Sequence, residues 1–334
     1  MKPKLKRLSD QVIVITGASS GIGLTTAEMA ARRGASVVLA ARGERELTGA
    51  AERIRDRGGQ AMAVVADVTD PAQVEHIAHR ALAEFGRIDT WVNNAGISVY
   101  GKLDDVPLED KRRIFDVTFW GVVHGSEAAV PRLRQRGGAL INVGSILSDL
   151  SAPLQGIYSA AKHAVKGYTD ALRMELEQAG EPIQVTLIKP GAIDTPYTQH
   201  AGNYLAREPK HPSPTYPPEE VAHAILRCAE RPMQEVVVGG VPRLQIAMHT
   251  LAPRLTERYM ERAMPKAQQS DEPAYSGDSL YAPSGEDYGR RRSRRSGRVM
   301  RSSLYTRAVV SDAMRAAPIV LGAAAIAAIV VARR

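Results

Sequence analysis

A phenol and an ammonium group lie four residues apart in the stretch "GIYSAAKHAVKGY", which begins at Gly156. In a helix Tyr158 and Lys162 share one face, because residues i and i+4 are neighbours on the helix surface. A free phenol has a pKa of about 10, and a nearby positive charge lowers it. An acid or base works best when its pKa approaches the working pH. The pair therefore indicates an acid/base centre, and a chance pair on a surface helix is the alternative.

Three glycines, Gly17, Gly21 and Gly23, lie between an apolar run and a helix-like stretch in "VITGASSGIGLTTAEMA". Glycine permits positive φ and lets a ligand approach the backbone closely. The following helix offers free N–H groups and the positive end of its dipole to an anion. The spacing is GxxxGxG rather than the commoner GxGxxG. The turn predicts a dinucleotide phosphate site, with a tight strand–helix turn as the alternative.

The second strand-like run ends in Ala40 and Ala41 and is followed by Arg42. An acidic residue at this point would accept a hydrogen bond from the ribose 2′-hydroxyl of NAD. A guanidinium instead suits a 2′-phosphate through its charge and paired donors. The sequence therefore favours NADP(H) over NAD, although Glu44 lies close by and a solvated surface arginine is the alternative.

These residues need a scaffold, and short β-branched runs alternate with helix-like stretches up to about Met264. The runs are nearly all apolar, as expected for a parallel sheet that helices cover on both faces. We predict an α/β fold with one doubly wound domain over residues 1–264. Its strands are expected at 12–17, 36–42, 61–67, 88–96, 138–145, 183–191 and 235–240, with one long helix near 107–135 and another at 218–230.

Five motifs occur together in one order: "TGASSGIG" from Thr16, "NNAG" at 93–96, Ser145, "YSAAK" at 158–162 and "PGAIDTP" at 190–196. The combination resembles the short-chain dehydrogenase/reductase family over about residues 8–262. The resemblance implies a Rossmann-type domain and an NAD(P)-dependent oxidoreductase that interconverts a carbonyl and an alcohol by hydride transfer.

The resemblance also implies the catalytic roles. Tyr158 exchanges a proton with the substrate oxygen, Lys162 tunes Tyr158 and holds the nicotinamide ribose, and Ser145 hydrogen-bonds the same oxygen. For Ser145 alone, a turn serine that caps a helix is the alternative. Thr118 in "DVTFWG" stands where the family usually has an asparagine that holds a proton-relaying water. Its hydroxyl can back-bond to the helix carbonyls and do part of this work.

The resemblance further implies which residues line the cofactor. The turn contributes backbone and hydroxyl groups, the third strand end contacts adenine, the fourth lines adenosine, and the sixth holds the nicotinamide carboxamide. The expected set is Gly17, Ser19, Ser20, Gly21, Ile22, Gly23, Arg42, Asp67, Val68, Asn94, Ala95, Gly96, Tyr158, Lys162, Pro190, Gly191, Ile193 and Thr195. For the last group, residues that simply end a strand are the alternative.

The long segment 197–220 after the sixth strand is predicted to form a lid over the substrate. Apolar walls are expected from Tyr100, Leu147, Leu150 and Leu154. They point to an apolar alcohol or ketone, such as a lipid, retinoid or steroid-like compound. His200 and His211 are expected at the surface, and no residue cluster has metal-ligand spacing, so no metal is predicted.

The charge is uneven along the chain. The net charge is +8, and six of these charges lie after Met264, so the front domain gives no reason to expect a specific nucleic-acid partner. Residues 265–302 are rich in Ser, Gly, Pro and Arg, which predicts a disordered, arginine-rich linker. The single cysteine, Cys228, excludes an intrachain disulfide.

Ala316–Ala332 is a 17-residue stretch without charge, near the lower limit for crossing a bilayer. We therefore expect residues 303–334 to form a C-terminal apolar helix that anchors the chain at the cytoplasmic face of a membrane, since arginines precede it. An apolar helix that packs on the enzyme or a partner, leaving the protein cytoplasmic, is one alternative, and a basic linker that binds nucleic acid nonspecifically is another.

The sequence thus predicts an NADP(H)-dependent oxidoreductase tethered by its tail. The rival hypothesis is an NADP-binding scaffold or sensor with little turnover, which Thr118 alone favours. By resemblance, a homo-oligomer built on the long helices is expected.

Overall fold

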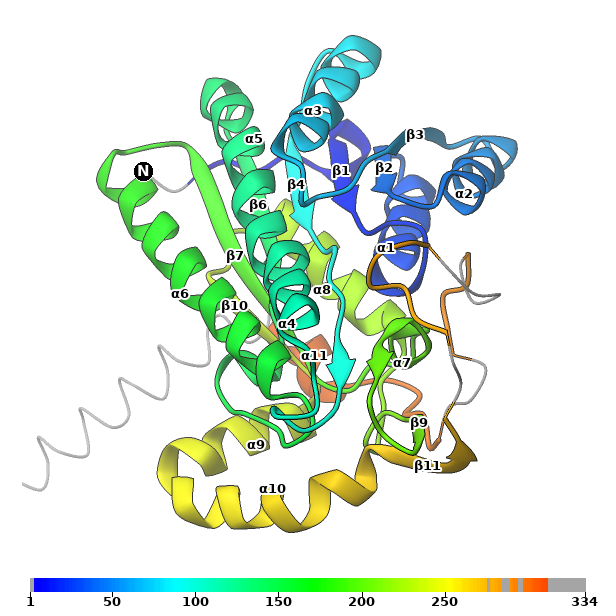
Figure 1. Cartoon of the computed structure of the whole chain (residues 1–334). Helices are drawn as coiled ribbons and strands as arrows, with labels where there is room; N and C mark the ends of the chain where they lie inside the picture. Colours follow the sequence, from blue (N-terminus) through cyan, green and yellow to red (C-terminus); the bar gives the residue numbers. More distant parts are fainter. Residues whose placement is uncertain (1–2, 275–276, 284–288, 294–296, 312–334) are drawn as a thin grey trace, which may run out of the picture.

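A parallel seven-stranded sheet forms the centre of the computed structural model, which describes residues 3–274, 277–283, 289–293 and 297–311 (Figure 1). The strand order is β10-β7-β6-β4-β1-β2-β3. The sheet strands are β1 Val12–Thr16, β2 Ser36–Ala41, β3 Gln60–Val65, β4 Thr90–Asn93, β6 Gly138–Val143, β7 Ile183–Pro190 and β10 Glu235–Val238. The predicted doubly wound sheet is confirmed, and each strand falls within or beside its expected run.

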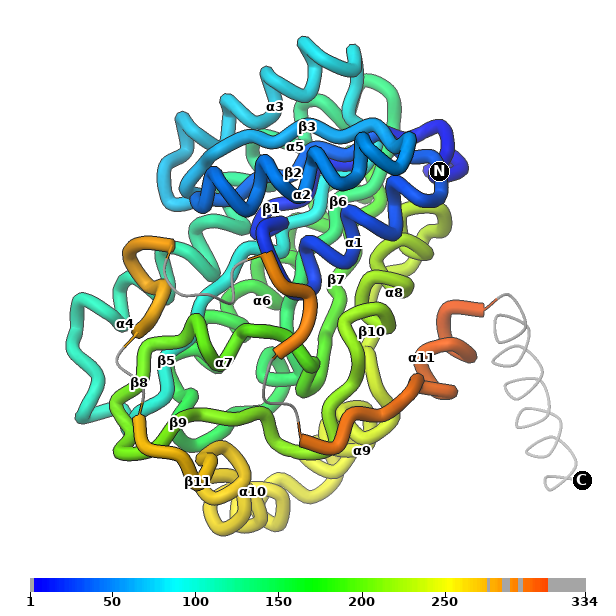
Figure 2. Tube along the Cα trace, turned by 90° about the vertical axis from the view of Figure 1, so that its right-hand side faces the viewer, coloured from blue at the N-terminus to red at the C-terminus, as the bar shows by residue number. Residues whose placement is uncertain are grey.

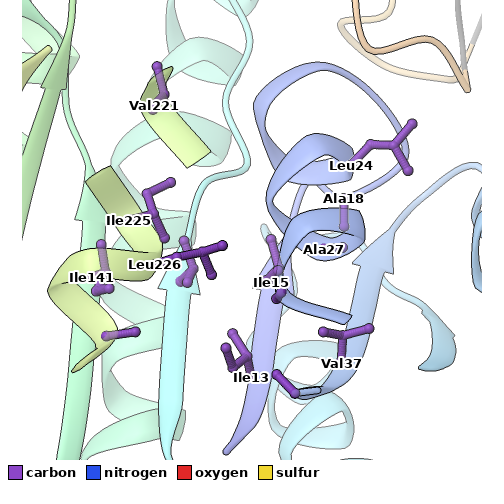
Figure 3. Close-up of a cluster of buried hydrophobic side chains, with 14 of the residues drawn as sticks. Ile13, Ile15, Ala18, Leu24, Ala27, Val37, Ile141, Val221, Ile225 and Leu226 are labelled. Atoms are coloured by element: carbon purple, nitrogen blue, oxygen red, sulfur yellow. The ribbon is translucent and has the colours of Figure 1, made fainter. Parts of the chain in front are cut away.

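Helices cover both faces of this sheet because successive strand residues point to opposite sides. In β1, Ile13 and Ile15 enter the core beneath α1 and α8, whereas Val12 and Val14 enter the opposite core. Figure 3 shows the first of these cores. The helices flanking the sheet are α1 Gly21–Arg32, α2 Glu44–Asp56, α3 Pro71–Phe85, α5 Gly121–Arg136, α6 Gly156–Gln178 and α8 Pro218–Glu230, and the short η1 Leu8–Asp10 precedes β1.

The long helix expected near 107–135 has an interruption. The structure contains α4 Leu108–Phe115, a π-helical segment Asp116–Trp120 and then α5. π-helical turns inside α-helices are frequent at functional sites. The wider turn contains Thr118, which is fully buried.

Short elements surround the carboxyl ends of the strands. They are η3 Ile146–Ser148, α7 Tyr197–His200, the parallel pair β5 Val99–Tyr100 and β8 Gly202–Asn203, and two helices after β10, α9 Gly240–Leu251 and α10 Pro253–Ala267. Neither α9 nor α10 was predicted as a separate helix from the sequence. They pack against each other below the sheet (Figure 1).

The described part of residues 265–302 differs from the expected disordered linker. Pro265–Ala267 complete α10, and β11 Gln269–Pro273 pairs antiparallel with β9 Arg207–Pro209. The later stretches lie against the domain, and α11 Leu304–Val309 contacts β10 and α9 (Figure 2). The physical reason is that their backbone groups and a few apolar side chains find partners on the domain, which composition alone does not reveal.

The stretch Ala316–Ala332 and most of the expected C-terminal helix lie outside the described residues. Within the part of the chain that the structure describes, no helix has both the length and the apolar character needed to cross a membrane.

Candidate active site

The glycine-rich turn between β1 and α1 is shaped by contacts that exclude side chains. Gly17 has φ +64°, and a Cβ there would lie 2.8 Å from Ala95 Cα. A Cβ on Gly23 would lie 2.3 Å from the carbonyl oxygen of Gly17. Gly23 therefore allows close backbone packing within the turn, and it is not among the residues that line the groove. Gly17 and Gly21 line the groove beside this turn, where the absence of side chains lets a dinucleotide pyrophosphate approach the backbone.

A groove with a volume of about 180 Å³ runs from this turn across the ends of β2, β3 and β4. Most of the residues predicted for the adenosine and phosphate side of the cofactor line it. They are Gly17, Ser19, Ser20, Gly21, Ile22, Arg42, Asp67, Val68, Asn94, Ala95 and Gly96, and Thr195, predicted for the nicotinamide end, lines the groove as well. The residues present therefore fit a nicotinamide dinucleotide.

The "NNAG" residues join β4 to the turn. Asn94 Nδ2 donates to the carbonyl oxygens of Thr16 and Gly17 at 2.9 and 3.1 Å. The Thr16 hydroxyl accepts from the backbone N–H groups of Asn94 and Ala95 at 3.0 and 3.1 Å. These bonds fix the turn relative to the sheet.

Ser145, Tyr158 and Lys162 meet in a second cavity, with a volume of about 190 Å³. α6 supplies Tyr158 and Lys162 from one face, and Ser145 follows β6 in an extended conformation. The Ser145 hydroxyl accepts from the backbone N–H of Leu147 at 3.1 Å and so caps η3. Ser145 also interacts with the Tyr158 phenol and acts to lower its pKa. Capping and contact with the phenol therefore occur together at Ser145.

Burial controls the acid/base properties of the pair. It raises the pKa of Tyr158 to about 12, although hydrogen bonds from Tyr197 and Ser145 act in the opposite direction. Burial also lowers the pKa of Lys162 to about 7. Lys162 Nζ lies 5.7 Å from the centroid of the Tyr158 ring and donates to the Val143 carbonyl oxygen at 2.7 Å. The expected lowering of the Tyr158 pKa is not found, because desolvation of both groups exceeds the attraction between them.

Thr118 does not line either cavity and does not bond back to its own helix, which corrects the sequence expectation. Its hydroxyl donates to the Ile97 carbonyl oxygen at 3.2 Å and accepts from the Ile97 N–H at 3.4 Å. A Cβ on Gly96 would lie 3.8 Å from both Thr118 Oγ1 and Lys162 Nζ. Thr118 thus fixes the backbone beside the lysine.

The residues at the end of β7 and after it border the second cavity. Pro190, Gly191, Ile193 and Thr195 all line this cavity, and Thr195 borders the groove as well. The two cavities therefore adjoin at Thr195.

The walls of the second cavity are largely apolar. Tyr100 and Leu147 line it as predicted, Leu150 is buried in the adjoining cluster, and Leu154 is not among the lining residues. A further set on α9 and α10 was not predicted from the sequence, namely Val241, Pro242, Gln245, Met260 and Met264. Their only sequence signal is an apolar stretch after the last strand.

The predicted lid segment covers the second cavity in part. His211, Pro212, Ser213 and Pro214 line it. The His211 ring stacks on the Tyr197 ring with centroids 5.7 Å apart, and burial lowers the pKa of His211 to about 4. His200 borders the groove. Both histidines were expected at the surface, but the segment folds inward and brings them to the site.

Two arginines lie at the adenosine end of the groove, of which the sequence analysis identified one. Arg113 Nη2 donates to Asp67 Oδ2 at 2.8 Å, and Arg42 Nη1 lies 4.0 Å from the same oxygen. Burial alone would raise the pKa of Asp67, but hydrogen bonds from Arg113 and Thr69 lower it overall. Arg113 escaped notice because only the fold brings α4 to this strand end.

Comparisons with known proteins agree with this arrangement. Residues 11–204 match the family model described as short chain dehydrogenase. The chain is 50% identical over 276 residues to "Uncharacterized oxidoreductase YxnA" of Bacillus subtilis (strain 168), a match covering 82% of this chain and 78% of that protein.

Two solved structures share the fold at 26% identity. One is an alcohol dehydrogenase from the archaeon Thermococcus sibiricus complexed with 5-hydroxy-NADP, with a TM-score of 0.61 over 68% of this chain and 95% of that one. The other is a short chain dehydrogenase/reductase from Burkholderia phymatum in complex with NAD, with a TM-score of 0.66 over 81% of this chain and 100% of that one.

Proposed function

Because the chain belongs to the short-chain dehydrogenase/reductase family of oxidoreductases, we propose that it is an NADP(H)-dependent enzyme that interconverts an apolar carbonyl compound and its alcohol. The observation that carries the proposal is the meeting of Ser145, Tyr158 and Lys162 in one cavity that adjoins the glycine-lined groove.

The cofactor supplies or accepts the hydride, and the chain handles the proton and the orientation of the substrate. Since burial raises the pKa of Tyr158 to about 12, its hydroxyl holds a proton near neutrality and gives it to a carbonyl oxygen during reduction. The Ser145 hydroxyl donates to the same oxygen and stabilises the charge that develops there. Lys162, whose pKa is about 7, holds the nicotinamide ribose and supports Tyr158 electrostatically.

The preference for NADP(H) rests on the end of β2. β2 ends at Ala41 without an acidic residue, and Arg42 follows directly and lines the groove. A guanidinium offers a 2′-phosphate paired, charge-assisted hydrogen bonds. Arg113, beside Asp67, adds a second positive group at this end.

An apolar substrate is supported by the walls of the second cavity. Tyr100, Leu147, Met260 and Met264 line it, and Ser145 and Tyr158 supply hydroxyl groups near the reacting position. Binding sites for small apolar molecules have this composition, with few and convergent polar groups. A lipid, retinoid or steroid-like alcohol or ketone is the substrate class that fits.

The membrane tether also stays a proposal. It is carried by the uncharged stretch Ala316–Ala332 and by the seven arginines within residues 290–301 that precede it. If the stretch spans a bilayer, the catalytic domain lies at the cytoplasmic face.

The test compares the full-length wild type with Tyr158→Phe. Nicotinamide absorbance is followed with NADPH and a panel of apolar ketones and aldehydes, and cofactor affinity is measured separately. Turnover should fall at least about 100-fold while NADPH binding persists, because proton transfer by a positioned side chain contributes this much. Tyr259→Phe, on an exposed tyrosine of α10, is the matched control.

The same experiment separates the enzyme from the rival, a cofactor-binding sensor with little turnover. Equal turnover by wild type and Tyr158→Phe would contradict the mechanism. Tight NADPH binding by the wild type without turnover across the panel would favour the sensor.

A further inference from the structure

Two described stretches of the C-terminal region, residues 277–283 and 289–293, lie along the cofactor groove. We call them the strap. In Figure 2, residues 289–293 pass beside β1 and α1, and residues 277–283 lie near α4. Ser279 lines the groove itself. The strap comes from about 240 residues further along the chain than the strand ends it covers, so its position is a property of the fold.

The strap occupies three of the five N–H donors of Arg42. Nη1 donates to the carbonyl oxygens of Leu280 and Tyr281 at 3.1 and 2.9 Å, and Nη2 donates to that of Ser279 at 2.5 Å. Arg113 Nε donates to the Leu280 carbonyl oxygen at 2.9 Å. These carbonyl oxygens are neutral acceptors held where the proposed function needs the oxygens of a 2′-phosphate.

The strap also uses the glycine-rich turn. The backbone N–H of Gly21 at the start of α1 donates to the Arg290 carbonyl oxygen at 2.8 Å. The Gly289 N–H donates to the Ser19 carbonyl oxygen at 3.1 Å. The free N–H groups at a helix N-terminus are those that a cofactor phosphate would use.

Contacts outside the groove hold the strap in place. Leu280 is 1% exposed and belongs to the core cluster that contains Val99. The Tyr281 hydroxyl donates to Asp110 Oδ1 at 2.7 Å, and the Arg113 guanidinium lies 5.8 Å from the centroid of the Tyr281 ring. Ser293 N–H donates to Asp194 Oδ1 at 3.3 Å. The strap is therefore anchored through the side chains of Leu280 and Tyr281, which are not among the residues that line the groove.

We propose that the strap is a built-in competitor of the cofactor, so that NADP(H) binds only when the strap leaves Arg42 and Gly21. This inference rests on the proposed function, since it assumes that the groove takes a dinucleotide phosphate. A guanidinium N–H or a backbone N–H satisfied by a carbonyl oxygen is not available to a phosphate. The apparent affinity is then the intrinsic affinity reduced by the fraction of molecules with the strap released.

The competition discriminates between cofactors. A 2′-phosphate needs Arg42, whose donors the strap holds with three carbonyl oxygens. A ribose 2′-hydroxyl does not need the guanidinium. The strap therefore lowers the affinity for NADPH more than the affinity for NADH.

The first test weakens the contacts that hold the strap in place, at side chains that are not among those lining the groove. Leu280→Ala and, separately, Tyr281→Phe are made in the full-length chain, and dissociation constants for NADPH and NADH are measured by calorimetry. We expect NADPH to bind about tenfold more tightly to Leu280→Ala than to the wild type, with a smaller gain for NADH and for Tyr281→Phe. Leu304→Ala, on an exposed leucine of α11, is the control and should leave both constants unchanged.

The second test follows the strap directly. Trypsin cleavage after Arg290, Arg291 and Arg292 of the wild type is timed by mass spectrometry with and without NADPH. NADPH should accelerate cleavage, since the bound cofactor displaces the strap. Protection by NADPH, together with weaker NADPH binding by Leu280→Ala, would overturn the competition and make the strap a lid that completes the site.

The outcomes separate this inference from the function on which it rests. Unchanged NADPH affinity in both strap variants, with turnover intact, contradicts the strap alone. Failure of NADPH and NADH to bind the wild type and both variants contradicts the proposed function.

Discussion

Burial of Lys162 determines how its ammonium group affects stability at different pH values. The pKa of a lysine is about 10.5 in an unfolded chain and is lowered to about 7 in the folded protein. Between these values the unfolded state binds more protons, so stability rises with pH. The contribution is fully present above about pH 10.5 and is lost as the pH falls to about 7.

The prediction is measured by denaturant unfolding of the wild type and Lys162→Met at pH 7 and pH 9. The wild type should gain up to about 1.4 kcal/mol per pH unit in its free energy of unfolding relative to the variant. Lys166→Met, which removes a partly exposed lysine one turn further along α6, is the control. A difference between wild type and Lys162→Met that does not change with pH would contradict the buried, low-pKa lysine.

The second prediction for a single residue concerns Arg42 and the choice between NADPH and NADH. Arg42→Asp should weaken NADPH binding about 100-fold, since charge-assisted hydrogen bonds are lost and a like charge faces the phosphate. NADH should bind as well as before or more tightly, because the variant also frees the strap. Fluorescence titration with both cofactors measures this, with Arg45→Asp, at a highly exposed neighbour, as control. Equal losses for NADPH and NADH would refute the cofactor preference.

Single residues were predictable where chemistry depends on local spacing. Tyr158 and Lys162 are brought together by one helix, and the glycines by one turn, so their positions followed from the sequence. Three features did not follow from the sequence. They are the upward shift of the Tyr158 pKa, the inward position of His211 and the contact of Arg113 with Asp67. Each depends on what packs around the residue, and those neighbours come from distant parts of the chain.

The π-helical segment between α4 and α5 presents an aromatic group to solvent. Trp120 is 48% exposed, and the Phe119 ring packs edge-on against both Trp120 and Tyr168 of α6. Exposed aromatic groups of this kind are enriched at interfaces between subunits. We expect the homo-oligomer to form through these helices.

Trp120→Glu should therefore shift the protein to a smaller species in sedimentation velocity, because it places a charge in the interface. Leu251→Glu is the control, since Leu251 at the end of α9 is 85% exposed and lies apart from these helices. A wild type that sediments as a monomer, or a Trp120→Glu variant of unchanged mass, would contradict this.

Among the helices and strands, most were predictable from the spacing of their apolar residues. The helix α8 was predicted with its observed ends. The π-helical segment was not, since one extra residue per turn leaves the apolar pattern almost unchanged. The split of the last part of the domain into α9 and α10 was also missed, although Pro253 begins the second helix. That proline is a helix-start signal which an apolar run on both sides obscured.

For the whole molecule, the prediction concerns whether the residues after Ser311 attach the chain to a membrane. A chain ending at Ser311 lacks the uncharged stretch Ala316–Ala332 but retains every described residue. In cell fractionation the full-length chain should sediment with membranes and the shortened chain should stay in the supernatant. Ala327→Leu, which keeps the stretch apolar, should remain with membranes. A full-length chain in the supernatant would refute the tether.

The arrangement of the C-terminal region was the least predictable feature of the molecule. Its composition is that of a linker, and nothing in residues 277–293 has the period of a helix or a strand. What orders it is the set of donors on the domain, chiefly Arg42, Arg113 and Gly21, which become neighbours only after the sheet has formed. Composition indicates whether a segment can fold by itself. It does not show which hydrogen-bond donors the folded domain presents to that segment.

The two cavities have a common wall, to which Ile22, Asn94, Gly96, Thr195 and Tyr197 all belong. The Tyr197 ring also lies edge-on against Tyr158, with centroids 5.6 Å apart. A ligand that moves this wall from one side changes the free energy of binding on the other, and the effect is reciprocal. Whatever factor a ligand in the second cavity adds to the affinity for a ligand in the groove, the ligand in the groove must add to the affinity in the second cavity.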